Sequence, residues 1–114
     1  MEHIINLKDI KEYMFGYLIV NKIYEIRDYY DLLEEDKDNK KKYNKLIINL
    51  KILDYIRDIN FVVLPNIGIL EDIKEFKKIG FLLNFHVYID PENIDDNIIM
   101  SKNDEDPINI KVIF

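Results

Sequence analysis

The sequence predicts one α+β domain with the element order α-α-β-α-β-β-β. In this arrangement two N-terminal helices pack on a small mixed sheet, which contains one βαβ unit and a C-terminal antiparallel meander. Apolar residues recur at helical spacing as far as residue 59, and they alternate with period two in the last third of the chain. Hydrophobic residues make up 48% of the 114 positions, enough for a core, and no repeat or linker divides the chain. Residues 1–114 are therefore expected to form a single domain.

The first helix is expected to begin at Asn6, which can cap it, with Asp9 three residues later as a weaker form of the capping box. Apolar side chains then recur every three or four residues as far as Leu33. A strand over Tyr17–Val20 remains the alternative, because this run is rich in residues that favour sheets and follows Gly16.

Residues 39–59 are predicted to form the second helix, with Asn39 as its cap. Its apolar residues define two faces. A helix with two apolar faces is either buried between layers or shared with another chain. Helix 39–59 is therefore also the expected seam of a homo-oligomer, should the chain form one.

The βαβ unit is expected over residues 61–89. Phe61–Leu64 is a continuous apolar run typical of a buried strand. Asn66 can cap a helix that ends at Gly80, and residues 81–89 alternate as a half-buried strand does. The apolar residues of that helix are Leu70, Ile73, Phe76 and Ile79.

Two further strands complete the predicted sheet. Residues 97–101 form a short strand, and residues 108–114 alternate between apolar and other side chains up to the end of the sequence. Turns over residues 90–93 and 102–107 connect them. The last three strands are expected to form the antiparallel meander.

The net charge of −6 lies entirely in residues 90–106, which hold seven acidic residues and one lysine. Two acidic clusters would converge if residues 97–103 formed a hairpin, and their carboxyl groups would then raise each other's pKa. Solvated turns, a basic protein partner and a divalent cation are the three interpretations. The spacing of a calcium-binding EF-hand loop is absent. The clusters are Asp95 with Asp96, and Asp104 with Glu105 and Asp106.

A lysine-rich run at residues 37–45 adjoins three acids at residues 34–36. Neighbouring acids weaken phosphate binding, so we expect a solvated loop and no direct contact with nucleic acid. Tyrosine is favoured at protein interfaces because it combines apolar area with a polar tip. Seven of the eight tyrosines lie before residue 56, and Tyr29 and Tyr30, flanked by acids, form the pair most expected to be exposed.

The composition restricts catalysis. Without cysteine or threonine, a hydroxyl or thiol nucleophile would have to be Ser101, the only serine, or a tyrosine. His86 lies between Asn84 and Tyr88 on one face of its predicted strand, but no nucleophile accompanies it, and His3 lies near a terminus. No enzyme activity, catalytic residue or cofactor is therefore expected. The sequence shows neither a signal peptide nor a membrane span, which indicates a cytoplasmic protein.

These observations favour a small acidic protein that binds another protein and acts by occlusion. Its partner would be a basic protein that handles nucleic acid, and the role that of an inhibitor, an immunity protein, an antitoxin or a phage-encoded anti-defence protein in the host cell. The alternatives are a small metal-assisted hydrolase or ligand sensor that uses the clustered carboxylates with His86, and a homo-oligomeric structural protein. The expected contact residues are Asp95, Asp96, Asp104, Glu105, Asp106, Tyr29 and Tyr30.

Overall fold

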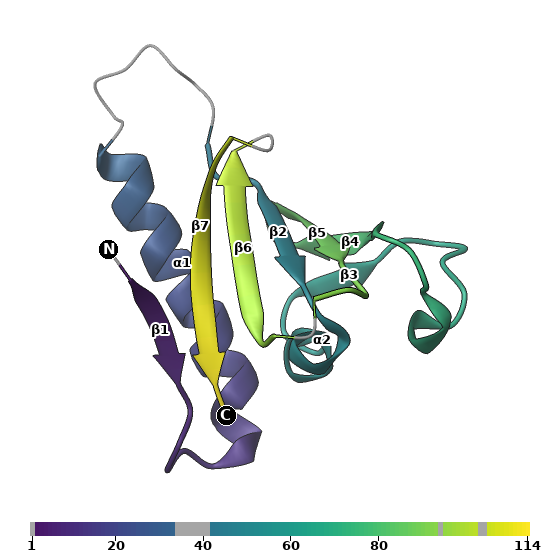
Figure 1. Ribbon diagram of the computed structural model, residues 1–114, viewed down its shortest axis with the longest axis horizontal. Helices are drawn as coiled ribbons and strands as arrows, with labels where there is room; N and C mark the ends of the chain where they lie inside the picture. The colour runs from purple at the N-terminus through teal and green to yellow at the C-terminus, as the bar shows by residue number, and fades with distance from the viewer. Residues whose placement is uncertain (1, 34–41, 94, 103–104) are drawn as a thin grey trace.

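A seven-stranded mixed sheet in the order β1-β7-β6-β2-β5-β4-β3 organises the structure (Figure 1). The structure, a computed structural model, describes residues 2–33, 42–93, 95–102 and 105–114. Its elements are β1 (His3–Asn6), η1 (Glu12–Met14), α1 (Phe15–Leu33), β2 (Lys45–Ile48), α2 (Leu50–Ile56), β3 (Phe61–Val63), η2 (Leu70–Asp72), β4 (Lys77–Leu82), β5 (Phe85–Ile89), β6 (Asn97–Lys102) and β7 (Glu105–Ile113), where η marks a short 3₁₀ helix.

The predicted element order is wrong at its start, because the chain opens with a strand and has one N-terminal helix. β1 pairs in parallel with β7 at one edge of the sheet, with Ile5 opposite Val112. The side chain of Asn6 accepts from the backbone N–H of Lys8 at 3.0 Å, so it stabilises a turn instead of capping a helix. The helix begins only at Phe15, after η1, and it includes Tyr17–Val20, which excludes the strand alternative.

The predicted helix 39–59 is also wrong. Lys45–Ile48 forms β2, a central strand that pairs in parallel with β5 and antiparallel with β6. The helix α2 is much shorter and begins after Asn49. The two apolar faces thus belong to two elements: the inward side of β2, and the buried side of α2 formed by Ile52, Leu53 and Ile56. The long helix proposed as an oligomer seam does not exist over residues 42–59, and residues 39–41 lie outside the described residues.

No βαβ unit forms over residues 61–89. Residues 66–79 contain only the short η2 and the start of β4, and Gly80 lies within β4 opposite Val63 instead of ending a helix. The alternating run 81–89 is a hairpin, in which Leu82 pairs with Phe85 across a two-residue turn. β3, β4 and β5 therefore run antiparallel, and β3 is an edge strand whose Val62 side chain is 64% exposed, not a buried strand.

The strands predicted over 97–101 and 108–114 correspond to β6 and β7, but β7 already begins at Glu105, within the predicted turn 102–107, and the three-stranded meander is wrong. β6 and β7 pair antiparallel, with Ile98 opposite Ile110. β5 and β6 are consecutive in the sequence but are not neighbours in the sheet, because β2 lies between them. The sheet thus joins segments that are distant in sequence.

Both helices cover one face of the sheet (Figure 1). The buried residues of β2, β5 and the first part of β6 alternate with half-buried ones, so one face of these strands supplies the core. β6 ends with three consecutive buried residues, Met100, Ser101 and Lys102. On the core face, the ring of Tyr24 in α1 stacks on Phe85 of β5. Gly16 lies where α1 crosses α2, and a side chain there would collide with the backbone carbonyl of Tyr55. No helix among the described residues has the length and apolar character needed to cross a membrane.

Candidate functional site

The segment that connects β5 to β6 is acidic, and we call its described residues, 90–93 and 95–96, the acidic loop. The backbone N–H of Asp90 donates to the carbonyl of Ile48 at 3.2 Å, which fixes the loop to the end of β2. The side-chain carboxylate of Asp90 accepts a hydrogen bond from the backbone N–H of Glu92 at 3.0 Å. The backbone carbonyl of Asp90 accepts one from the backbone N–H of Asn93 at 3.1 Å. These local bonds form a turn, so the carboxylates are presented from a defined backbone.

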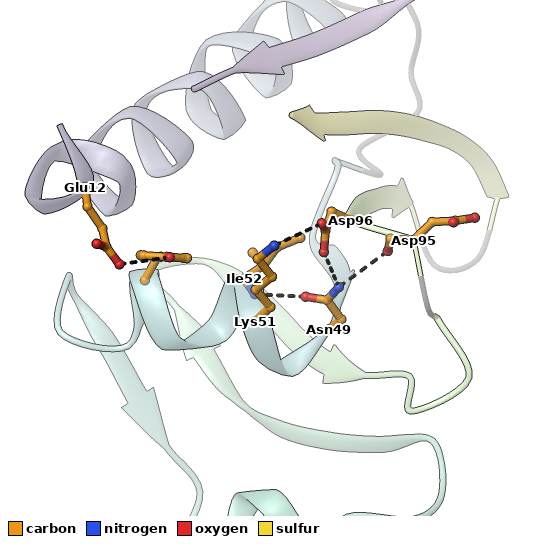
Figure 2. A network of polar contacts seen from close by, with 7 residues as sticks. Glu12, Asn49, Lys51, Ile52, Asp95 and Asp96 are labelled. Carbon is orange, nitrogen blue, oxygen red and sulfur yellow. Dashed lines mark hydrogen bonds and ion pairs between the residues drawn. The ribbon is translucent and has the colours of Figure 1, made fainter. Parts of the chain in front are cut away.

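A polar network connects this loop to the start of α2 (Figure 2). The side-chain oxygen of Asn49 accepts from the N–H of Ile52 at 2.8 Å, which caps the helix. The same amide donates to the Asp96 carboxylate at 2.9 Å and to the Asp95 carbonyl at 3.4 Å. Lys51 lies 3.5 Å from the other Asp96 oxygen. Asn49 thus forms hydrogen bonds with the first turn of α2 and with the acidic loop at the same time.

The two adjacent aspartates of the loop therefore have different surroundings. Asp96 is half-buried and bound by Asn49 and Lys51, so its carboxylate is engaged within the molecule. Asp95 is exposed, and in Figure 2 its carboxylate points away from Asn49. Glu92 is exposed as well. Asp95 and Glu92 are consequently the carboxylates that this loop offers to another molecule.

A cleft of about 440 Å³ adjoins the acidic loop. It brings Glu2, which precedes β1, close to Asp95, while Lys111 of β7 provides a positive charge in the same lining. The full lining is Glu2, His3, Asp95, Asp96, Asn97, Asn109, Lys111 and Val112. The cleft therefore extends the acidic surface from the loop to the edge of the sheet.

The two acidic clusters do not converge. Residues 97–102 form the single strand β6, so the described acids Asp96 and Glu105 lie at its opposite ends, separated by about 20 Å at 3.3 Å per residue. Glu105 is exposed at the start of β7, whereas Asp104 and the side chain of Asp106 lie outside the described residues. The close carboxylates expected to raise each other's pKa are not brought together. Among the described residues, no group of three or more acidic or histidine side chains is placed to hold a metal ion.

Tyr29 and Tyr30 lie near the C-terminal end of α1. Tyr30 is half-buried, its hydroxyl lies 2.8 Å from Nε2 of His3, and its ring packs against that of Tyr43. Lys102, at the end of β6, lies 5.2 Å from the centre of the Tyr43 ring. Through His3 the pair adjoins the cleft that Asp95 and Asp96 line, and through Tyr43 it adjoins the end of β6. Tyr29 is the more exposed of the two, at 44%.

Two other tyrosines are exposed where the first helical segment begins. Tyr13 of η1 and Tyr17 of α1 are 74% and 60% exposed, with Met14 between them exposed as well. The sequence-based expectation named Tyr29 and Tyr30 as the exposed pair, and it did not single out Tyr13 and Tyr17.

A series of side-chain contacts connects these tyrosines to the loop. Glu12, next to Tyr13, accepts a hydrogen bond from Tyr55 of α2 at 3.1 Å. Tyr55 stacks on Phe114, and Lys51 lies 4.1 Å from the centre of the Phe114 ring. Lys51 in turn pairs with Asp96. We call this surface the α2 end: Tyr13, Tyr17, Glu92, Asp95 and the exposed side of α2.

Two pKa shifts mark contacts that hold the elements together. Burial lowers the pKa of His3 below its usual value, because it disfavours the charged imidazole, and the ammonium of Lys22 adds repulsion. Burial raises the pKa of Tyr55, and the hydrogen bond to Glu12 raises it further. Both groups join a helix to another element, which argues for structural roles.

The candidate catalytic residues do not form a reactive pair. Ser101 and His86 both lie opposite Lys45, on the two sides of β2. Ser101 is only 3% exposed, which closes it to a substrate. His86 is bound to Lys78, with 2.7 Å between Nζ and Nδ1. The described geometry thus gives no nucleophile with an accessible base.

Comparison with known proteins adds no assignment, since no family model, curated protein or solved structure matches this chain.

Proposed function

We propose that the protein is a non-enzymatic binding protein that occludes a basic protein partner with its α2 end. Because the partner's basic surface would ordinarily face phosphate, a nucleic-acid-handling protein remains the proposed class, and the cytoplasm the proposed compartment. The observation that supports the proposal is the series of side-chain contacts across α2, which connects the segment of the exposed tyrosines at one end of this helix to the exposed carboxylates at the other (Figure 2).

Each half of this surface has a physical role in binding. The carboxylates of Glu92 and Asp95 attract a basic surface at long range and raise the association rate. Tyr13 and Tyr17 supply large, stiff side chains of the type that dominate interface energetics. The loop is already fixed by hydrogen bonds to β2 and α2, so little conformational entropy is lost when it binds.

The test is a pull-down at low salt from lysate of the native host, with three variants beside the wild type. Glu92→Lys with Asp95→Lys reverses the acidic half, and Tyr13→Ala with Tyr17→Ala removes the aromatic half. Glu71→Lys with Asp72→Lys is the matched control, because these exposed acids in η2 lie on another part of the surface and give the same change in net charge.

A basic protein retained by the wild type and the control, and lost from the other two variants, would support the proposal. A partner retained equally by all four proteins would contradict it, and so would a captured protein that is itself acidic. All four proteins should show the same circular dichroism spectrum, because every substituted side chain is exposed.

A further inference from the structure

The sheet face that α1 and α2 leave uncovered holds two clusters in which a lysine lies over an aromatic ring. Lys45 Nζ is 4.5 Å from the centre of the Tyr88 ring and 5.4 Å from that of Phe76. Lys78 Nζ is 4.3 Å from the centre of the Phe81 ring. We call the whole set the lysine–aromatic strip: Lys45, Phe76, Lys78, Phe81, His86 and Tyr88.

The strand register places these side chains on one face. Lys45 and Phe81 are both opposite His86, and Lys78 is opposite Tyr88. Residues directly opposite each other in paired strands point to the same side of the sheet. The alternate residues of these strands are buried in the core beneath the helices, among them Leu46, Leu82 and Val87. The strip therefore lies on the face away from α1 and α2.

His86 adds a hydrogen-bond donor to the strip. An ammonium group can only donate, so Nδ1 of His86 must accept from Lys78 at 2.7 Å. The ring proton then lies on Nε2. The side chain of His86 is half-buried and packs edge-on against Phe81, 5.0 Å between ring centres. Two ammonium groups and one imidazole N–H are thus gathered among flat rings.

The charge of the strip favours an anionic ligand. The described residues that β2, β4 and β5 place on this face are Lys45, Ile47, Lys78, Phe81, His86 and Tyr88, and none is a carboxylate. The net charge of −6 comes from a segment that joins this part of the sheet only at the end of β5. The segment that carries Phe76 adds two acids and two lysines, whose charges cancel: Asp72, Lys74, Glu75 and Lys77. At physiological salt, charges beyond about 8 Å are largely screened, so Lys45 and Lys78 give the strip its positive formal charge.

From these observations we propose that the lysine–aromatic strip binds single-stranded nucleic acid. Lysines neutralise backbone phosphates, and aromatic rings stack on unpaired bases of any sequence. Phe76, 50% exposed and stacked on Tyr88, is the ring most available to a base. A sheet face with exposed rings suits splayed single strands, whereas the bases of a duplex are stacked on each other. This proposal replaces the expectation that the lysine-rich run 37–45 is a solvated loop without direct nucleic-acid contact, because Lys45 of that run lies in β2. It uses none of the residues of the α2 end.

The test is fluorescence anisotropy of a labelled oligothymidylate of about ten nucleotides, titrated with the full-length protein at low salt. Lys45→Gln with Lys78→Gln removes both charges and keeps most of each side chain, and we expect at least a tenfold loss of affinity. The slope of log affinity against log salt should fall by about 1.4, which is 0.7 for each lost phosphate contact. Phe76→Ala, at an exposed position, should weaken binding about tenfold with an unchanged salt slope.

The matched control is Lys8→Gln with Lys11→Gln, which removes two exposed lysines from the connection between β1 and η1. It should bind as the wild type does. The proposal is overturned if the wild type does not bind, if the control loses as much affinity as the strip variant, or if a duplex of the same length binds as tightly as the single strand. Thermal melts of each variant identify any loss that comes from unfolding. The variants of the α2 end should bind the oligonucleotide normally, so this test and that of the protein partner fail independently.

Discussion

The amide of Asn49 binds Asp96 at 2.9 Å while its oxygen caps α2 at 2.8 Å, so one side chain fastens the acidic loop to the helix. This explains why one of the two adjacent aspartates is not available to a partner. It also gives a direct way to loosen the α2 end without changing its exposed residues.

Asn49→Ala should destabilise the protein by about 1–2 kcal/mol, because it removes the helix cap and leaves the half-buried Asp96 with one partner fewer. Asn49→Asp keeps a capping oxygen but sets two carboxylates against each other. Adding Asp96→Asn should then recover part of the stability by restoring a donor. Urea unfolding of the wild type, Asn49→Asp, Asp96→Asn and the double variant measures this coupling. Additive effects of Asn49→Asp and Asp96→Asn on the free energy of unfolding would contradict the described contact.

Tyr24→Phe should raise stability by about 1 kcal/mol. The Tyr24 hydroxyl is buried and has no hydrogen-bond partner among the described residues, and an unsatisfied buried polar group is costly. Tyr55→Phe is the contrasting change, since it removes the bond to Glu12 and should lower stability by about 0.5 kcal/mol. Thermal melts of both variants measure these changes in stability. A lower stability of Tyr24→Phe would mean that the Tyr24 hydroxyl has a hydrogen-bond partner.

Gly16→Ala should cost about 1–3 kcal/mol or more, because the new methyl group would meet the Tyr55 carbonyl where the two helices cross. Gly68→Ala is the control. It has open space around it but a φ of +81°, so only backbone strain of about 1 kcal/mol applies. Equal losses in the two variants would show that the close approach of α1 and α2 is absent.

Acidification should destabilise the protein in part through His3, whose pKa in the folded state lies below 6.5. The unfolded chain then takes up the proton first, so the contribution is complete above about pH 6.5 and is lost as the pH falls from there toward the folded-state pKa. His3→Gln removes this titration and should show a smaller loss of unfolding free energy between about pH 7.5 and 5.5. An identical loss in the variant would assign the effect to other groups.

Local patterns predicted some elements well. Period-two alternation located β7, and helical spacing located the body of α1, because each is one continuous element whose buried face repeats regularly. Over 45–56, a strand and a helix follow each other around Asn49, and their combined apolar residues imitate one long helix. The signal that separates them is Asn49 itself, a cap residue directly before the apolar run of α2.

Other errors come from non-local pairing. The turn at Leu83 and Asn84 has two residues, so the core-facing positions change from even numbers in β4, such as Leu82, to odd numbers in β5, such as Phe85. Residues 81–83 are all apolar, which hides this change of phase, so the hairpin resembles one strand in the sequence. The insertion of β2 between β5 and β6 separates strands that are neighbours in sequence. The acidic segment could be identified from composition, but its position beside α2 follows from that insertion and from Asn49, which composition does not reveal.

The most direct test of the account is the affinity for the captured basic partner, measured against salt for the wild type, for Glu92→Lys with Asp95→Lys, and for Glu71→Lys with Asp72→Lys. The account predicts that the affinity of the wild type and of the η2 control falls steeply as salt rises, while the loop variant binds weakly at every salt concentration. An affinity that stays constant with salt, or a loop variant that binds as the wild type does, would contradict the assignment of the acidic loop as the contact surface.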